Sequence, residues 1–187
     1  MPEPDVQQSN PPTGIRRDGT VLGFDVGMRR IGVAVGSAFG HGARALAVID
    51  VHAHGPDWPA LDRLQKEWRP DGLVVGDPMT LEGGDQPIRR FAHAFATQLQ
   101  ARYSLPVVLV DERASSIEAA QRFAAERAEG RRKRRDAAAL DAVAAAVIVE
   151  RWLAAPGDGV PVDAIASQAE NPWLLPNPSI VEPGPER

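Results

Sequence analysis

Residues 21–27, Val21-Leu22-Gly23-Phe24-Asp25-Val26-Gly27, have the pattern of a buried β-strand that carries one carboxylate in its middle. An ionised carboxylate is costly to bury unless it is paired or binds a metal, so we expect a function for Asp25. Gly23 and Gly27 remove side-chain bulk beside it, which lets a backbone, a metal ion or a phosphate come close. Taken alone, Asp25 fits a turn acid or a salt-bridged strand acid about as well, and the rest of the chain decides between these readings.

The order of the other apolar patterns predicts an α/β fold. A second strand over 30–36 follows after a short turn, which favours an antiparallel hairpin, and a third strand is expected over 43–50. Two apolar runs, 73–76 and 106–113, are typical of parallel strands buried on both faces. Amphipathic patterns predict helices over 57–68, 86–102, 115–128 and 136–154. Together they predict a five-stranded mixed sheet flanked by helices.

Composition divides the 187-residue chain into one body and two tails. Residues 1–18 are polar and Pro-rich, and residues 155–187 are rich in Pro, Gly and acids, so we expect mostly disordered tails around a body over 19–154. The net charge is −4, yet the body carries 18 Lys and Arg against 17 Asp and Glu. The acidity lies in the tails and does not exclude a nucleic-acid partner for the body.

Several classes of protein are excluded by what the sequence lacks. The chain has no cysteine, which excludes disulfides and zinc–thiolate sites and suits a reducing compartment. Its first residues contain no apolar region of a signal peptide, and no apolar run approaches the roughly 18 residues that span a bilayer. We therefore expect a cytoplasmic protein without a membrane partner.

Three acids are predicted to converge. Asp25 lies in the first strand, and Glu112 lies at the carboxyl end of a parallel strand, where open α/β sheets place their sites. Asp141 lies in the last helix among alanines, which allow that helix to approach the sheet closely. Asp136 points about 140° away on the same helix and is better explained as its N-cap. Asp111 faces the opposite side of the strand from Glu112, so only one of the two can share a site with Asp25.

Four segments in this order resemble the YqgF (RuvX) family of bacterial proteins. The segments are Leu22-Gly23-Phe24-Asp25-Val26-Gly27, Arg30-Ile31-Gly32-Val33-Ala34, Val107-Val108-Leu109-Val110-Asp111-Glu112-Arg113 and Asp141-Ala142-Val143-Ala144-Ala145. Each is weak alone, but four at sensible spacing are specific, and the likeness covers about residues 19–153. This family is assigned as nucleases of the small-subunit ribosomal RNA precursor and was earlier described as Holliday-junction-resolvase-like. The resemblance implies a ribonuclease H-like fold.

The resemblance also implies which residues form the site. Asp25, Glu112 and Asp141 would be the catalytic, metal-binding acids, with Arg30 and Arg113 beside them to bind nucleic acid. Oxygen ligands of this kind suit Mg²⁺ or Mn²⁺. Two such ions, roughly 3.5–4 Å apart, can activate water and stabilise the leaving oxygen of a phosphodiester.

The chain departs from the family pattern in two loops. Thr80 and Glu82-Gly83 stand where the family usually has an Asn and an Asp-Gly pair. The segment Ala114-Ser115-Ser116 replaces a Leu and threonines. These loops are expected to touch substrate, so the departures bear on the substrate rather than on the three acids.

A basic stretch precedes the helix that carries Asp141. It consists of Arg131, Arg132, Lys133, Arg134 and Arg135. Such a stretch is often only a solvated face, but phosphates drawn to it here would lie near the predicted metals. No aromatic stacking platform accompanies it, so sequence-specific reading of unstacked bases has no support.

These observations predict a Mg²⁺- or Mn²⁺-dependent phosphodiesterase that acts on structured or single-stranded RNA, in maturation of the 5′ end of pre-16S rRNA. We expect a monomer or a weak homodimer. One alternative is a Holliday-junction-resolvase-like DNA endonuclease, and another is a non-catalytic RNA-binding ribosome-assembly factor. The segment Gly23–Gly27 also resembles the first phosphate motif of actin-like ATPases and sugar kinases, but those need two such domains, and this chain has room for one.

Overall fold

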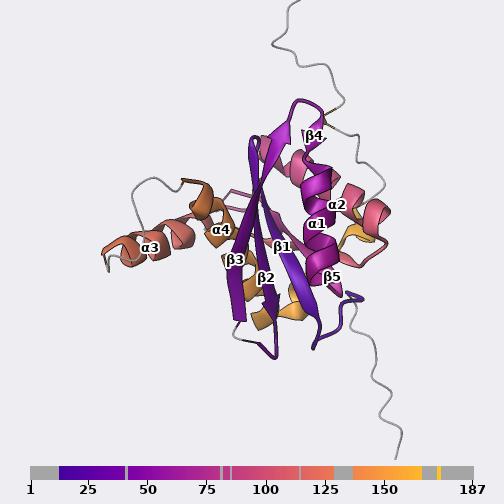
Figure 1. Ribbon diagram of the computed structural model, residues 1–187, viewed down its shortest axis with the longest axis horizontal. Helices are drawn as coiled ribbons and strands as arrows, with labels where there is room; N and C mark the ends of the chain where they lie inside the picture. Colours follow the sequence, from indigo (N-terminus) through magenta and orange to yellow (C-terminus); the bar gives the residue numbers. More distant parts are fainter. Residues whose placement is uncertain are drawn as a thin grey trace, which may run out of the picture.

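The fold is built on a seven-stranded mixed sheet with the strand order β4-β3-β2-β1-β5-β6-β7 (Figure 1). The computed structural model describes residues 13–40, 42–80, 82–84, 86–113, 115–128, 137–165 and 172–173. The strands are β1 (Thr20–Val26), β2 (Arg30–Ser37), β3 (Gly42–His52), β4 (Gly55–Pro56), β5 (Gly72–Asp77), β6 (Val107–Asp111) and β7 (Val160–Pro161). Strands β5 and β6 run parallel to β1, whereas β2, β3, β4 and β7 each run antiparallel to the strand they join.

The predicted mixed sheet is confirmed, with one correction to its size. All five predicted strands are present, and the sheet gains one short strand at each edge, β4 and β7. Both additions are two residues long and end in proline, so they have too few residues to show alternating hydrophobicity. Edge positions also tolerate proline, because its missing N–H can face away from the ladder.

Helices cover both faces of the sheet. They are α1 (Trp58–Trp68), α2 (Pro87–Tyr103), α3 (Ser115–Ala128) and α4 (Ala137–Ala154). Helices α1 and α2 lie on one side, α4 lies on the other, and α3 extends outward beside α4 (Figure 1). The side chain of Asp57 caps α1 by accepting a hydrogen bond from the backbone N–H of Ala60 at 3.1 Å. The four predicted helices are therefore present.

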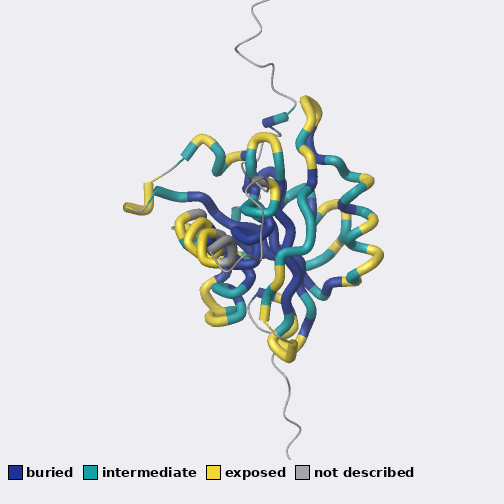
Figure 2. Tube along the Cα trace, turned by 60° about the vertical axis from the view of Figure 1, so that its left-hand side comes forward, coloured by how far each residue is buried: buried dark blue, intermediate teal, exposed yellow. Residues whose placement is uncertain are grey.

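Two apolar layers hold the helices to the sheet. On the α1–α2 side, Phe24 of β1 meets Phe95 of α2 edge to face at 5.3 Å between ring centroids, and Trp58 stacks on Phe95 at 5.9 Å. On the α4 side, Ile148 and Trp152 are almost fully buried against β1, β5 and β6. Figure 2 shows the resulting pattern, with buried strands at the centre and exposed residues on the outer sides of the helices.

Glycines let α4 lie directly on the sheet. A Cβ atom on Gly32 of β2 would collide with the backbone carbonyl of Asp141. Cβ atoms on Gly23 and Gly36 would collide with the side chain of Val149. The close approach expected from the small residues of this helix is therefore confirmed, and it places the first half of α4 over the end of the β1–β2 hairpin.

Packing extends past both boundaries expected from the sequence. Ile15 is buried against Gly72 at the start of β5, although it lies within the predicted N-terminal tail. After α4, β7 pairs with β6, and Val162 in the short 3₁₀ helix Val162–Ala164 is fully buried. Trp173 meets Phe91 of α2 at 5.3 Å between ring centroids. Disorder of the tails stays a prediction for residues 1–12, 166–171 and 174–187, which lie outside the described residues. Among the described residues, no helix has both the length and the apolar character needed to cross a membrane.

Removing the segment after Ala155 should lower the melting temperature. The truncation removes β7 and exposes the site of Val162, whose side chain alone contributes about 1.5–3 kcal/mol by burial. For a protein of this size, 1 kcal/mol corresponds to about 2–4 °C, so we expect a fall of at least about 5 °C by differential scanning calorimetry. The substitution Trp173→Ala in the full chain measures the contribution of the aromatic contact to the melting temperature separately from that of β7. An unchanged melting temperature in the truncated protein would contradict the contribution of this segment.

Candidate metal-binding active site

Asp25 and Glu112 lie next to each other on the α4 side of the sheet. Asp25 is near the end of β1, opposite Gly32 of β2, and Glu112 directly follows β6. Glu112 reaches over the end of β5, where a Cβ atom on Gly76 would collide with its Oε2 atom. Only glycine at this position leaves room for the carboxyl group between β5 and α4, so the strand ends themselves shape the site.

The surroundings of both carboxyl groups favour their protonated forms. Burial raises the pKa of Glu112 most, and the charge of Asp25 raises it further, whereas Arg151 lowers it. Burial also raises the pKa of Asp25, a hydrogen bond with Glu112 lowers it, and the charge of Asp141 raises it. Glu112 Oε2 is buried and has no hydrogen-bond partner among the described residues. Two adjacent acids whose pKa values are raised in this way would be stabilised in their ionised forms by a bound cation.

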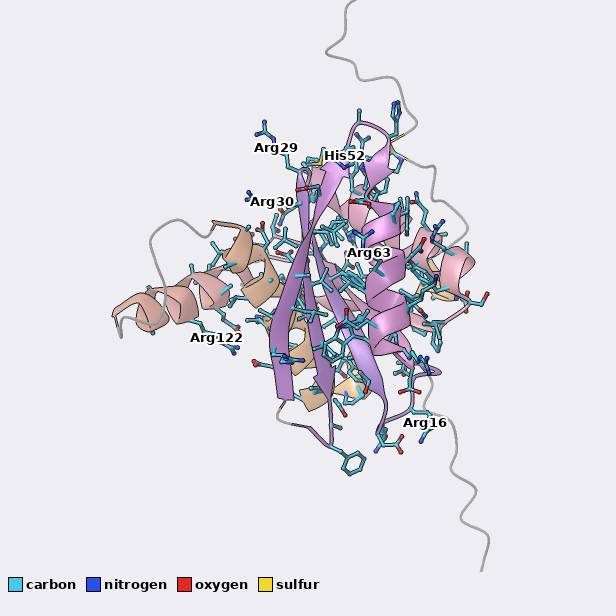
Figure 3. The ribbon with its side chains drawn as sticks, in the orientation of Figure 1. Arg16, Arg29, Arg30, His52, Arg63 and Arg122 are labelled. Atoms are coloured by element: carbon cyan, nitrogen blue, oxygen red, sulfur yellow. The ribbon has the colours of Figure 1, made fainter. Side chains whose placement is uncertain are left out.

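The third predicted acid, Asp141, lies beside this pair but is held by an arginine. Its Oδ2 atom accepts a hydrogen bond from Nε of Arg30 at 2.7 Å, and both side chains are partly exposed. Arg30 begins β2 at the end of the sheet where the β1–β2 turn lies (Figure 3). Within the described part of the chain, no three His, Asp or Glu side chains are gathered as a preassembled metal site. The structure therefore joins Asp25 and Glu112, and it keeps Asp141 close enough for its charge to act on Asp25.

This donor set fits a hard divalent cation. The available ligands are carboxylate oxygens, which Mg²⁺ and Mn²⁺ prefer, and one of them is a buried oxygen without a partner. A cation would also relieve the repulsion that raises the pKa of both buried acids. Asp25 and Glu112 would hold it directly, and Asp141 would join after exchanging its partner Arg30.

Of the other predicted site residues, the structure describes Arg113 but not the basic stretch 131–135. Arg113 is exposed and forms an ion pair with Asp111, whose side chain also accepts from the backbone N–H of Arg113 at 2.9 Å. Asp111 thus does not join Glu112 beside Asp25, which agrees with the prediction that only one of them can. The basic stretch 131–135 and the predicted N-cap Asp136 lie outside the described residues, so their roles stay predictions.

Comparison with known proteins assigns the family. A sequence model described as "RuvX: Holliday junction resolvase" matches residues 19–155, which is most of the chain. The chain belongs to the RuvX family. A relative from Xanthomonas axonopodis pv. citri (strain 306), named "Putative pre-16S rRNA nuclease", is 78% identical over 142 residues, covering 76% of this chain and 92% of the relative. A relative of the same name from Xanthomonas campestris pv. campestris (strain B100) is 75% identical over the same coverage.

The RuvX assignment agrees with the resemblance noted in the sequence. A solved structure of Thermus thermophilus RuvC covers 76% of this chain and 99% of its own, at 19% identity and a TM-score of 0.46. The ribonuclease H-like fold rests on RuvX membership and on the strand order, in which the β3-β2-β1 antiparallel sheet continues into parallel β5 and β6. The matched residues 19–155 end before β7, so the short strand and Trp173 lie outside the matched region.

Two groups around the site were not predicted. Arg151 of α4 fixes the end of β6, because its Nη1 atom donates to the backbone carbonyls of Asp111 at 3.1 Å and Arg113 at 2.7 Å. Its Nη2 atom donates to Glu118 of α3 at 2.6 Å. The second group surrounds Asp77 on the opposite face of the sheet. Arg151 lies in the last turn of a helix and Asp77 is the last residue of a strand. Both placements are common in proteins, so the sequence alone did not indicate these contacts.

The raised pKa values predict a pH-dependent stability in metal-free buffer. A carboxyl whose folded pKa exceeds its unfolded value stabilises the protein below the unfolded pKa, and this contribution is lost as pH rises toward the folded pKa. Because both residues keep some solvent contact, we expect less than the full shift, with the free energy of unfolding falling by more than about 1 kcal/mol between pH 5 and pH 8.

Urea denaturation with a chelator present measures this loss. Glu112→Gln should show a smaller fall over the same pH range, because the amide neither ionises nor repels Asp25. Adding Mn²⁺ should restore stability at pH 8 in the natural protein and much less in the variant. An equal pH dependence in both proteins would contradict the assignment of the effect to Glu112.

Proposed function

We propose that this RuvX protein is a divalent-metal-dependent nuclease that hydrolyses RNA phosphodiester bonds in the maturation of the 5′ end of pre-16S rRNA. The observation that carries the proposal is the pair of buried carboxyl groups of Asp25 and Glu112, with Asp141 beside them. The name shared by relatives that are 75–78% identical supports the choice of substrate. The absence of cysteine from the sequence agrees with a cytoplasmic setting.

The proposed roles of the residues follow from their surroundings. Mg²⁺ or Mn²⁺ bound by the acids would supply Lewis-acid stabilisation of the negative charge that develops on the phosphodiester. Binding of the cation would favour the ionised forms of Asp25 and Glu112, since their charges are then compensated. Arg30, once released from Asp141, carries a guanidinium that matches a phosphate and would orient the scissile strand. Water attacks phosphorus, the P–O3′ bond breaks and its oxygen takes a proton, leaving a 3′-hydroxyl and a 5′-phosphate.

Affinity for RNA would come from cations around this site. Arg113 lies close to the loop that follows β5, because its Nη1 atom is 3.5 Å from the Cβ position of Gly83. The turn between β1 and β2 adds Arg29, which lies beside Arg30 (Figure 3). The basic residues 131–135 would extend this surface just before the helix that carries Asp141. We propose that the protein acts as a monomer or a weak homodimer, because a single site suits cutting a single strand.

Substituting the three acids should abolish cleavage without unfolding the protein. Asp25→Asn, Glu112→Gln and Asp141→Asn each remove a charged ligand, and each should slow Mn²⁺-dependent cleavage of a pre-16S rRNA fragment by at least about 100-fold. Asp136→Asn, which makes the same chemical change one residue before the start of α4 in the sequence, is the matched control and should cleave normally. The measurement is cleavage rate by gel, with circular dichroism to check folding. Full activity of Asp141→Asn together with loss in Asp136→Asn would overturn the assignment of Asp141.

A Holliday-junction resolvase is the second candidate, because the matched family carries that description. A junction resolvase makes paired cuts related by a two-fold axis, which requires two active sites in a symmetric dimer. We expect faster cleavage of the rRNA precursor fragment than of a mobile four-way DNA junction, each tested with Mn²⁺ and with Asp25→Asn as control. Symmetric paired nicks in the junction that exceed RNA cleavage would favour the resolvase. Binding of both without cleavage would favour a non-catalytic assembly factor.

A further inference from the structure

Asp77, at the end of β5, is a buried acid that the proposed chemistry does not use. It is 9% exposed. Its Oδ1 atom accepts from Nε of Arg89 at 2.7 Å and lies 2.9 Å from Nε2 of His93. Its Oδ2 atom accepts from Nη2 of Arg89 at 3.0 Å. Both partners lie on α2, one helical turn apart, so the end of β5 is bonded to the first half of that helix.

The same strand end holds Glu112 on the opposite face. The backbone carbonyl of Asp77 accepts a hydrogen bond from the N–H of Glu112 at 3.3 Å. The preceding residue, Gly76, provides the space in which Glu112 Oε2 lies. Successive residues of a strand face opposite sides, so the Asp77 side chain points to α2 while Gly76 faces α4. One dipeptide therefore connects helix α2 to the carboxyl group of Glu112.

The bonds to Asp77 are strong enough to fix its position. Burial alone would raise the pKa of Asp77, but the hydrogen bonds from His93 and Arg89 and their charges lower it to about 2. Asp77 is thus ionised throughout the neutral range, and its bidentate contact with Arg89 is a geometry that fixes direction as well as distance. Losing the Asp77 carboxylate removes one hydrogen-bond acceptor from the side chains of Arg89 and His93.

We propose that Asp77, held by Arg89 and His93, is a positioning residue that fixes Glu112 for metal binding. The inference rests on the proposed metal-binding function of Glu112. The alternative is that Asp77 only fastens α2 to the sheet. Asp62 of α1 provides a comparison for that alternative, because it accepts from Nε and Nη2 of Arg102 at 2.8 and 2.6 Å and from the Tyr103 hydroxyl at 2.7 Å. Those partners lie at the other end of α2, away from the site.

The test compares Asp77→Asn with Asp62→Asn in the full chain. Both variants remove one negative charge and weaken one bidentate contact between an arginine and a carboxylate, so both should lower the melting temperature. Titration with Mn²⁺ followed by electron paramagnetic resonance should show a Kd about 10-fold weaker in Asp77→Asn. Asp62→Asn should keep its Kd within about 2-fold of the natural protein, because its effect is confined to packing. A Kd in Asp77→Asn that matches that of Asp62→Asn would overturn the positioning role.

If Asp77→Asn folds poorly, the variant His93→Gln replaces it. If manganese does not bind, hydrogen exchange of the Glu112 amide replaces the titration. His93→Gln removes the ring but keeps an amide that can donate to Asp77, so it should fold and weaken Mn²⁺ binding less than Asp77→Asn. Hydrogen exchange of the Glu112 backbone amide, measured without metal, should be faster in Asp77→Asn and unchanged in Asp62→Asn. Unchanged Glu112 exchange in Asp77→Asn would overturn the inference. Absence of Mn²⁺ binding by the natural protein, with the exchange difference present, would overturn the proposed metal site instead.

Discussion

The close contact between α4 and the sheet buries the two carboxyl groups that the strand ends bring together, and the candidate site depends on this contact. A Cβ atom on Gly23, Gly32 or Gly36 would collide with α4, so glycine at these positions allows the helix to approach β1 and β2 closely. The helix then covers Asp25 and Glu112, and burial raises the pKa of both. Each glycine allows this close contact but has no side chain that could contribute apolar packing. A larger residue at Gly32 would move Asp141 and uncover the pair at the same time, so packing and chemistry are set by the same positions.

The negative charge of the site is limited in two ways, by an arginine beside Asp141 and by the burial of Asp25 and Glu112. Arg30 forms an ion pair with Asp141 at 2.7 Å, whereas burial raises the pKa of Asp25 and of Glu112 and so favours their uncharged forms. A divalent cation would replace both kinds of compensation. Its binding would therefore release a proton and a guanidinium together, and the released guanidinium would be available to a phosphate. If the proposed roles hold, metal binding and substrate binding would be coupled, because each would favour the separation of Arg30 from Asp141.

The main features of the fold and the three acids follow from sequence patterns, and the contacts between them do not. Strand alternation was enough to separate Glu112 from Asp111. The choice of Asp141 over Asp136, made from helical periodicity, stays a prediction because Asp136 lies outside the described residues. The contact between Arg30 and Asp141 joins residues 111 positions apart, so no local pattern contains it. The hydrogen bonds of Asp77 likewise join the end of a strand to a separate helix, so no local sequence pattern contains them. The β7 strand was missed because two residues ending in proline resemble the acidic, Pro-rich segment around them.

The segment after α4 adds apolar packing to a fold in which several glycines contribute none. Residues without a Cβ atom contribute little apolar burial on the α4 side, whereas β7 completes the edge of β6, and the residue that follows it, Val162, is fully buried in the α1–α2 layer. Trp173 extends that layer by contacting Phe91. The added packing lies on the face opposite the three acids, so it stabilises the sheet without restricting access to the site. This separation allows one face to contribute stability while the other keeps the close backbone contacts and the acids of the proposed metal site.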